Sequence, residues 1–183
     1  MAKIKLNLTE SVEEIFAKFM LSRKIKGLAE KTLVSYQSQF QAIAKHLDIP
    51  VISDDSGLVI DALGGAPGIH SARYLGKDTD YKTKNTIILS RLADVKGEDR
   101  SARFVCAMGL VYPNGKEMTF TGTIEGYIHD QIEGPNGFGY DPIFYYPPFG
   151  TTTANVSDEM KNSVSHRGNA LKKLMEYLDH EEA

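Results

Sequence analysis

Two adjacent aspartates, Asp54 and Asp55, lie in the stretch VISDDSGLVID, between two short apolar runs that are typical of strands. Carboxylates directly after a strand can supply oxygen ligands to Mg²⁺, and one of them can orient or deprotonate a water molecule. The hydroxyl of Ser56 can donate to a phosphate oxygen, and Gly57 lets a backbone come close. The alternative is an Asx turn that links two strands and does no chemistry.

A second candidate is the segment FGYD at residues 138–141. Its glycines and the following Pro142 restrict the loop, so Phe138 and Tyr140 can present a ring face to a planar base. The alternative is a hydrophobic loop whose rings pack on the core. The sequence around these residues leaves both interpretations open.

A third group consists of Lys161, His166 and Arg167, the last two within SHRG. Lysine and arginine supply hydrogen-bond donors without acceptors, which suits an anionic or carbonyl-bearing ligand. The alternative is a solvated basic face. The spacing of histidines and the single cysteine predicts no zinc site, and the chain has neither a Walker A motif nor a GxSxG elbow.

The three groups complement one another. Acids and a serine suit a metal ion and phosphates, aromatic rings suit a base, and donors suit a base edge or phosphates. Together they favour a nucleotide phosphohydrolase over any interpretation of one group alone.

Composition limits the alternatives. The chain has 183 residues, of which 42% are hydrophobic and 25% charged, enough for one core or two small domains. A formal net charge of −3 gives no overall basic bias toward nucleic acid or membranes. The single Cys106 favours a reducing compartment. No apolar run is long enough to span a membrane and no signal core is evident, so we expect a cytoplasmic protein.

Helical periodicity dominates the beginning of the chain. Residues 11–26 have a capping box at Ser11 and Glu14, and residues 29–47 carry apolar side chains at helical spacing before Pro50. This part is predicted to be a helical hairpin. The composition changes near residues 45–50 to mixed α/β sequence, so we expect an α/β fold with a central sheet and flanking helices after an N-terminal helical part.

Turn residues organise the remainder. Asn114-Gly115 between two β-rich runs predicts a hairpin. GGAPG at residues 64–68 predicts irregular backbone. The other predicted segments are a helix over 80–95, the hairpin strands within 100–113 and 116–128, a long stiffened loop over 133–150, and a helix over 157–178.

From about His46 to Leu178 the chain closely resembles the inosine triphosphate pyrophosphatase family. The matching stretches are IPVISDDSGLVIDALGGAPGIHSARYLG, RSARFVCAMGL, GPNGFGYDPIF and KNSVSHRGNALKKL, in the family's order and spacing. The combination is highly specific, although each piece alone is not. The resemblance implies a mixed α/β fold with a long central sheet, a cleft between two lobes, and homodimers.

The resemblance also implies a reaction. Family members cleave ITP, dITP or XTP between the α- and β-phosphates in a Mg²⁺-dependent manner, giving a nucleoside monophosphate and pyrophosphate. By position, Asp55 corresponds to the water-activating acid and metal ligand, with Asp54 beside it. The resemblance implies that His166 and Arg167 read the 6-oxo edge of the purine. The full implied set of substrate-binding residues is Ser56, Phe138, Gly139, Tyr140, Asp141, Lys161, His166 and Arg167.

The first 45 residues depart from that family. Members normally open with a strand, a Thr/Ser-x-Asn-x-x-Lys loop for the triphosphate and a metal-binding glutamate, and no residue here matches these positions. Residues 11–47, with GLAEKTLVSYQSQF at their centre, instead resemble the N-terminal core-binding domain of phage-type tyrosine recombinases. We therefore expect a helical part over 1–47 and a pyrophosphatase-like part over 48–183, a join of two families that is either natural or engineered.

Three functional hypotheses follow. The first is a Mg²⁺-dependent pyrophosphatase for purine nucleoside triphosphates, in which new N-terminal residues replace the missing loop. The second is a relic that binds nucleotide without efficient catalysis. The third is a DNA-binding module formed by the N-terminal helices, which ranks last because only part of a core-binding domain is present.

Overall fold

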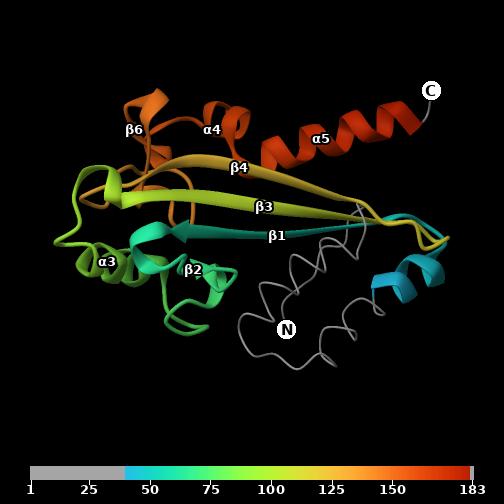
Figure 1. Cartoon of the computed structure of the whole chain (residues 1–183), viewed down its shortest axis with the longest axis horizontal. Coiled ribbons are helices and arrows are strands. Elements are labelled where there is room, and N and C mark those ends of the chain that lie inside the picture. Colours follow the sequence, from blue (N-terminus) through green and yellow to red (C-terminus); the bar gives the residue numbers. More distant parts are fainter. Residues whose placement is uncertain (1–39, 182–183) are drawn as a thin grey trace. The chain divides into compact units, whose positions relative to one another are not determined.

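The computed structural model describes residues 40–181 of the chain (Figure 1). Residues 40–47 are helical, which agrees with the end of the second helix predicted for the N-terminal part. The rest of the predicted helical hairpin lies outside the described residues, and so do most of the residues that carry the recombinase resemblance.

A six-stranded sheet forms the centre of the described part, in the order β2-β1-β3-β4-β5-β6. The pairs β1–β2, β4–β5 and β5–β6 are antiparallel. Three long strands, β1, β3 and β4, run alongside one another in Figure 1. The strands are β1 (Val51–Ile60), β2 (Pro67–Gly68), β3 (Ser101–Val111), β4 (Thr119–Ile128), β5 (Phe144–Tyr146) and β6 (Thr151–Thr152). The predicted α/β fold with a central sheet is confirmed.

The hairpin prediction is also confirmed. Strands β3 and β4 are joined by a turn in which the amide of Gly115 donates to the carbonyl of Tyr112 over 2.9 Å. The side chain of Asn114 accepts from the amide of Lys116 at 2.9 Å. Gly115 has a φ of 86°, a left-handed conformation that glycine adopts without steric cost. The Asn-Gly dipeptide thus fixes the turn through both of its residues.

Strand β1 corrects the interpretation of the aspartate stretch. The sequence predicted two short strands around DDSG, with an Asx turn as the alternative. The structure has one continuous strand over Val51–Ile60, so both aspartates lie inside it. Residues Pro67–Gly68, predicted to be irregular, pair with Val59 and Leu58 as strand β2. Pairing with neighbouring strands outweighs the low β propensity of aspartate and glycine.

Gly57 lets β2 and the segment that follows it approach β1. A Cβ atom on Gly57 would lie 2.3 Å from the carbonyl oxygen of Gly68. The neighbouring amide of Leu58 donates to the hydroxyl of Ser71 at 2.9 Å, and that hydroxyl donates to the carbonyl of Gly68 at 2.6 Å. The backbones are therefore held at a distance that only glycine permits.

We expect Gly57→Ala to lower the free energy of unfolding by about 1–3 kcal/mol, the usual cost of overpacking a close contact. Urea denaturation measures this change. Gly97→Ala is the matched control, because a Cβ there meets nothing within 4 Å and only its φ of 57° opposes the substitution. An effect of Gly57→Ala no larger than that of Gly97→Ala would contradict the proposed close contact.

Two helices replace the single helix predicted over residues 157–178. Helix α4 (Asp158–Val164) ends at Ser165, whose φ of −64° and ψ of 153° are extended, and helix α5 (His166–Glu181) follows. The hydroxyl of Ser165 accepts from the amide of Gly168 at 3.0 Å and so caps α5. A Cβ on Gly168 would lie 2.4 Å from the carbonyl of Asn162, so the two helices meet where only glycine fits.

Helix α3 (Tyr81–Arg91) confirms the helix predicted over 80–95, with a shorter C-terminal end. The side chain of Asp80 accepts from the amide of Thr83 at 2.9 Å and caps the helix. This hydrogen bond lowers the pKa of Asp80. Among the helices of the described part, none is long and apolar enough to cross a membrane.

The segment predicted as a long loop over 133–150 contains more order than expected. Strand β5 (Phe144–Tyr146) lies within it, between two 3-10 turns at Asp141–Ile143 and Pro147–Phe149. Both turns begin with proline at an early position, which fixes φ without removing a needed hydrogen bond. The FGYD segment therefore leads directly into an edge region of the sheet.

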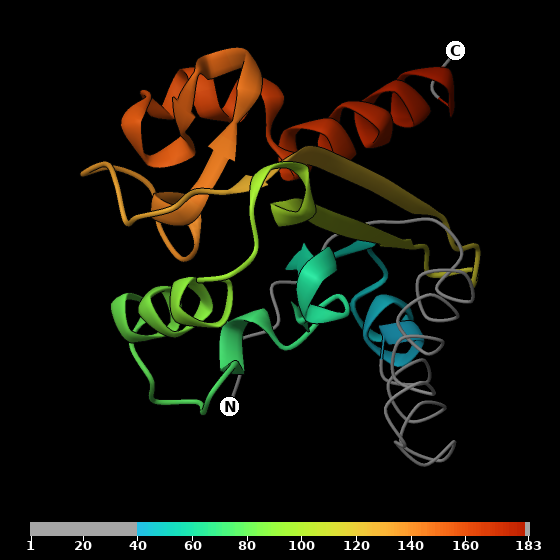
Figure 2. The same cartoon turned by 60° about the vertical axis from the view of Figure 1, so that its left-hand side comes forward.

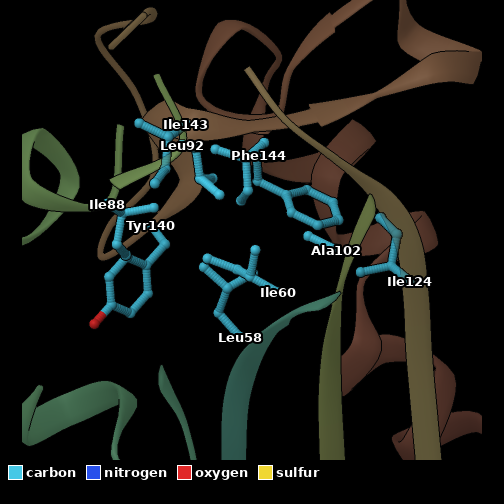
Figure 3. Close-up of a cluster of buried hydrophobic side chains, with 10 residues drawn as sticks. Leu58, Ile60, Ile88, Leu92, Ala102, Ile124, Tyr140, Ile143 and Phe144 are labelled. Atoms are coloured by element: carbon cyan, nitrogen blue, oxygen red, sulfur yellow. The ribbon is translucent and has the colours of Figure 1, made fainter. Parts of the chain in front are cut away.

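The described residues fall into two compact units, and strands β1, β3 and β4 contribute to both. The second unit contains residues 56–105 and 123–169. Its core is a cluster of fully buried aliphatic and aromatic side chains from α3, the sheet and the turn at 141–143 (Figure 3). Those drawn and labelled in Figure 3 are Leu58, Ile60, Ile88, Leu92, Ala102, Ile124, Tyr140, Ile143 and Phe144.

The first unit, whose described residues are 40–55, 106–122 and 170–181, has its own core, in which Leu110 and Phe120 of the hairpin pack with Leu174 of α5. The end of α5 is tied to the hairpin as well, because Glu181 accepts hydrogen bonds from Lys116 and Tyr112. The bond from Lys116 contributes most to lowering the pKa of Glu181, which is about 2.

Candidate functional site

A cavity of about 200 Å³ lies within the second unit. Its walls come from β1, the segment at 71–72, β3, the FGYD segment and the junction of α4 with α5. Every residue predicted to bind substrate lines this one cavity: Ser56, Phe138, Gly139, Tyr140, Asp141, Lys161, His166 and Arg167. Three stretches that are far apart in the sequence are therefore brought to one place.

Asp141 organises one side of the cavity. Its Oδ2 atom accepts from the ammonium of Lys161 at 2.6 Å and from the amide of Phe138 at 2.7 Å. Its Oδ1 atom accepts from the hydroxyl of Thr153 at 3.0 Å. These contacts occupy both oxygens of a side chain that is only 5% exposed. Asp141 therefore positions Lys161, the backbone of Phe138 and Thr153. Its predicted place in the base pocket is thus that of a support.

Two cations flank the exposed ring of Phe138. The Nζ atom of Lys161 lies 4.3 Å from the ring centroid, and the Cζ atom of Arg167 lies 5.8 Å from it. The ring is 65% exposed, which is unusual for a phenylalanine and leaves a face for a planar ligand. The cations beside it suit a ligand that combines a flat ring with negative charge.

His166 is held by an aromatic neighbour. Its imidazole stacks on the ring of Phe104, with centroids 4.9 Å apart and an angle of 14° between the planes. His166 is buried and is the first residue of α5, so the helix start fixes its backbone while Phe104 fixes its ring. The imidazole therefore lines the cavity in a set orientation.

Tyr140 lines the cavity and connects two of its walls. Its hydroxyl donates to the carbonyl of Ser71 at 2.8 Å, and its ring makes an edge contact with Tyr81 at 5.2 Å between centroids. Burial raises the pKa of Tyr140 above the usual tyrosine value, so the hydroxyl keeps its proton and remains a donor. This hydrogen bond joins the FGYD segment to the segment that follows β2.

Asp54 and Asp55 are exposed residues of β1, two positions and one position before Ser56 in the chain, respectively. The thiol of the buried Cys106 donates to Oδ2 of Asp54 at 3.1 Å. Successive side chains of a regular strand point to opposite faces of the sheet. The two carboxylates therefore point to opposite faces of the sheet and do not form a pair. In a turn, by contrast, they could have lain side by side.

The implied metal can be tested against these residues. Among residues 40–181, no group of three or more histidine, cysteine, aspartate or glutamate side chains could hold a metal ion. Mg²⁺ is commonly held by one or two carboxylates together with substrate phosphates. The carboxylate of Asp55 is exposed, and alternation along β1 places it on the face opposite to Asp54 and the cavity residue Ser56.

The cavity is also lined by residues to which the sequence assigned no role. These are chiefly Ser71, Tyr81, Phe104, Asn162 and Ser165. Phe104 lies within a β-rich run whose hydrophobic pattern predicts burial and gives no sign of a neighbouring histidine. The proximity of Tyr81 to Tyr140 depends on the packing of α3. Only the capping role of Ser165 has a local signal, a serine three residues before a glycine at a helix start.

Known proteins resemble this chain in sequence. The model of the Ham1 family matches residues 8–177. A dITP/XTP pyrophosphatase of Listeria monocytogenes is 42% identical over 172 residues, which cover 88% of this chain and 85% of that protein. A dITP/XTP pyrophosphatase of Halalkalibacterium halodurans is 48% identical over 139 residues, which cover 76% and 72% respectively.

A solved structure gives the same result. The Staphylococcus aureus Ham1 protein superposes with a TM-score of 0.73 and 44% sequence identity, over 77% of this chain and 72% of that one. The family match begins at residue 8 and so includes residues 11–47. The recombinase resemblance of that segment stays a prediction. Because the sequence match, the fold and the grouped cavity residues agree, the chain belongs to the Ham1 family.

Proposed function

We propose that this chain is a nucleoside-triphosphate pyrophosphatase that acts on deaminated purine nucleotides such as dITP and XTP. It would release a nucleoside monophosphate and pyrophosphate. The observation that carries the proposal is the single cavity lined by all eight residues predicted to bind substrate. Relatives at 42% and 48% identity that are called dITP/XTP pyrophosphatases support it.

The base would stack on the exposed ring of Phe138. His166 and Arg167 would donate to the 6-oxo group of hypoxanthine or xanthine. Adenine carries an amino group at that position, which is itself a donor, so two donors would face each other without an acceptor. A site with buried donors rejects such an analogue strongly, because its polar groups are left unpaired.

The phosphates would lie toward β1, since Ser56 lines the cavity and its hydroxyl can donate to a phosphate oxygen. By the family resemblance, Asp55 would accept a proton from the attacking water. Bound Mg²⁺ would neutralise charge on the phosphates and on the departing pyrophosphate, and Asp55 is the residue that would hold it. Lys161, whose ammonium donates to Asp141 at 2.6 Å, would donate a further hydrogen bond to the substrate.

The test is pyrophosphate release from dITP, XTP and dATP, measured with Mg²⁺ and again with a chelator in excess. We expect pyrophosphate release from dITP and XTP with Mg²⁺. The rate of release from dATP should be at least about a hundredfold lower, because a site that hydrogen-bonds one substrate rejects an analogue that leaves its polar groups unpaired. Chelation is expected to stop the reaction. Equal rates for dITP and dATP would contradict the base-reading role of His166 and Arg167.

A chain that binds dITP without releasing pyrophosphate would instead support a nucleotide-binding relic. Calorimetric titration with dITP in the presence of a chelator separates binding from turnover. The family's triphosphate loop is expected within residues 1–45, most of which lie outside the described part.

The proposal extends to assembly and location. Homodimers and a cytoplasmic location are what the family resemblance and the composition suggest. Sedimentation measures the first. A DNA-binding role of residues 11–47 would require salt-sensitive binding at low ionic strength, since phosphate contacts release counterions. Its absence would leave the pyrophosphatase function alone.

A further inference from the structure

Helix α3 carries two consecutive polar residues that are almost fully buried. Lys84 is 1% exposed and Asn85 is 2% exposed. Burying an amide or an ammonium group costs free energy unless hydrogen bonds compensate it. Neither residue lines the cavity, and neither belongs to the groups that the sequence singled out.

Lys84 reaches the segment that follows β2. Its Nζ atom donates to the carbonyl of Ala72 at 2.8 Å and lies 4.6 Å from the ring centroid of Tyr81. No carboxylate of the described residues forms an ion pair with it. The buried charge is therefore placed on a backbone carbonyl and an aromatic ring. Both Ala72 and Tyr81 line the cavity.

Asn85 reaches the FGYD segment on the other side. Its Nδ2 atom donates to the carbonyl of Gly139 at 3.1 Å. A carbonyl only accepts hydrogen bonds, so this contact decides which way the amide points. The Oδ1 atom is buried and has no hydrogen-bond partner in residues 40–181. The amide is thus kept in place by a single bond to the segment that presents Phe138.

These two bonds join separate walls of one cavity. Ala72 and Gly139 are far apart in the sequence, and each lines the cavity. Two adjacent side chains of α3 each bond to one of them. Figure 2 shows α3, in green, beside the segment that contains Ala72. Since α3 is a capped helix, the distance between its two anchor points is fixed.

We propose that Lys84 and Asn85 are positioning residues that set the spacing of these two walls and thereby sharpen the discrimination of 6-oxo from 6-amino purines. This inference rests on the proposed function. Gly139 lies between Phe138 and Tyr140, so a displacement of its carbonyl moves the ring on which the base would stack. Displacements of about 1 Å commonly cost about a hundredfold in rate when they misalign a substrate.

The most direct test uses Asn85→Asp. The substitution keeps the size of the side chain and replaces the donor that faces Gly139 by an acceptor, so the bond becomes a repulsion. Ser90→Asp is the matched control, because it adds the same charge to an exposed position of the same helix. Lys84→Met, with the exposed Lys82→Met as its control, tests the other wall. Asn85→Ala serves if Asn85→Asp does not fold.

Hydrogen exchange reads the spacing without relying on catalysis. The amides of Phe138 and Asp141 are hydrogen bonded within the FGYD segment. We expect them to exchange at least about tenfold faster in Asn85→Asp, while amides of the first unit keep their rates. Faster exchange throughout the chain would indicate general destabilisation and would overturn a positioning role, and so would unchanged exchange at both amides.

Substrate discrimination gives the second measurement. We expect the ratio of kcat/KM for dITP over dATP to fall about tenfold in Asn85→Asp and in Lys84→Met, and to stay unchanged in both controls. An unchanged ratio in a folded variant would overturn the proposal, whatever its melting temperature. Failure of the proposed function appears separately, as absence of turnover in the unmodified chain. Exchange at Phe138 and the calorimetric affinities for dITP and dATP then decide the inference.

Discussion

The Asp55→Asn variant is expected to release pyrophosphate from dITP about a thousandfold more slowly than the unmodified chain, the usual contribution of a positioned base. Asparagine keeps the shape of the side chain but can neither accept a proton from water nor neutralise a metal ion. Asp55 is exposed on β1, so its replacement is expected to change the free energy of unfolding by less than about 0.5 kcal/mol. Single-turnover pyrophosphate release measures the rate.

Asp94→Asn is the control for the loss of one exposed carboxylate outside β1. Asp54→Asn is more informative. Asp54 and Asp55 lie on opposite faces of β1, so slower release from Asp54→Asn than from Asp55→Asn would instead assign the attacking water to the face of Asp54 and Ser56. Equal background release from the unmodified chain and from Asp55→Asn would refute the enzymatic hypothesis. Retained dITP binding in that case would identify a relic.

The second large effect is expected from Asp141→Asn. The carboxylate of Asp141 and the ammonium of Lys161 are 5% and 12% exposed, so they form a nearly buried ion pair. Removal of one charge leaves the other without compensation in a poorly solvated place. We expect the free energy of unfolding to fall by about 3 kcal/mol, as when one partner of a buried pair is removed. Urea denaturation of the two chains measures the difference.

The double variant Asp141→Asn/Lys161→Met separates stability from chemistry. Removal of both charges is expected to recover at least half of the lost stability, since no buried charge remains unpaired. Activity on dITP is not expected to return, because the Lys161→Met substitution removes the ammonium group that would contact the substrate. Glu125→Gln is the control for an exposed pair. Its partner Arg103 lies 3.1 Å away and Glu125 is 67% exposed, so the loss should stay below about 1 kcal/mol.

A double variant no more stable than Asp141→Asn alone would contradict this account of the ion pair. It would mean that the loss does not come from an unpaired ammonium of Lys161, and the other two contacts of Asp141, with the amide of Phe138 and the hydroxyl of Thr153, would not explain it either. Asparagine can keep both of them, since its oxygen accepts and a hydroxyl also accepts. The cycle therefore distinguishes charge from shape.

Local sequence determined several elements correctly because their signals lie within a few residues. Asn114-Gly115 specifies a turn through its own backbone and side chain, and Asp80 caps α3 three residues before the amide that it accepts from. The family resemblance then grouped Ser56, the FGYD segment and the SHRG segment. All their predicted binding residues line one cavity.

Elements whose partners are distant could not be predicted in this way. The sequence of β1 contains Asp-Asp-Ser-Gly, which is unfavourable for a strand, and the strand continues because β2 and β3 pair with it. Strand β5 lies in a segment rich in glycine and proline for the same reason. The break at Ser165 was not predicted, because it accompanies the close approach of Gly168 to the carbonyl of Asn162, which is set by the packing of the two helices.

The sequence by itself determined which residue types this protein offers to a nucleotide and which family it belongs to, since both depend on short stretches and their order. The tertiary structure alone decided how they act. It turned Asp141 into a support for Lys161, stacked His166 on Phe104, and used the buried Lys84 and Asn85 to join two walls. Those roles depend on distances between segments that are remote in the chain, and such distances are set by packing.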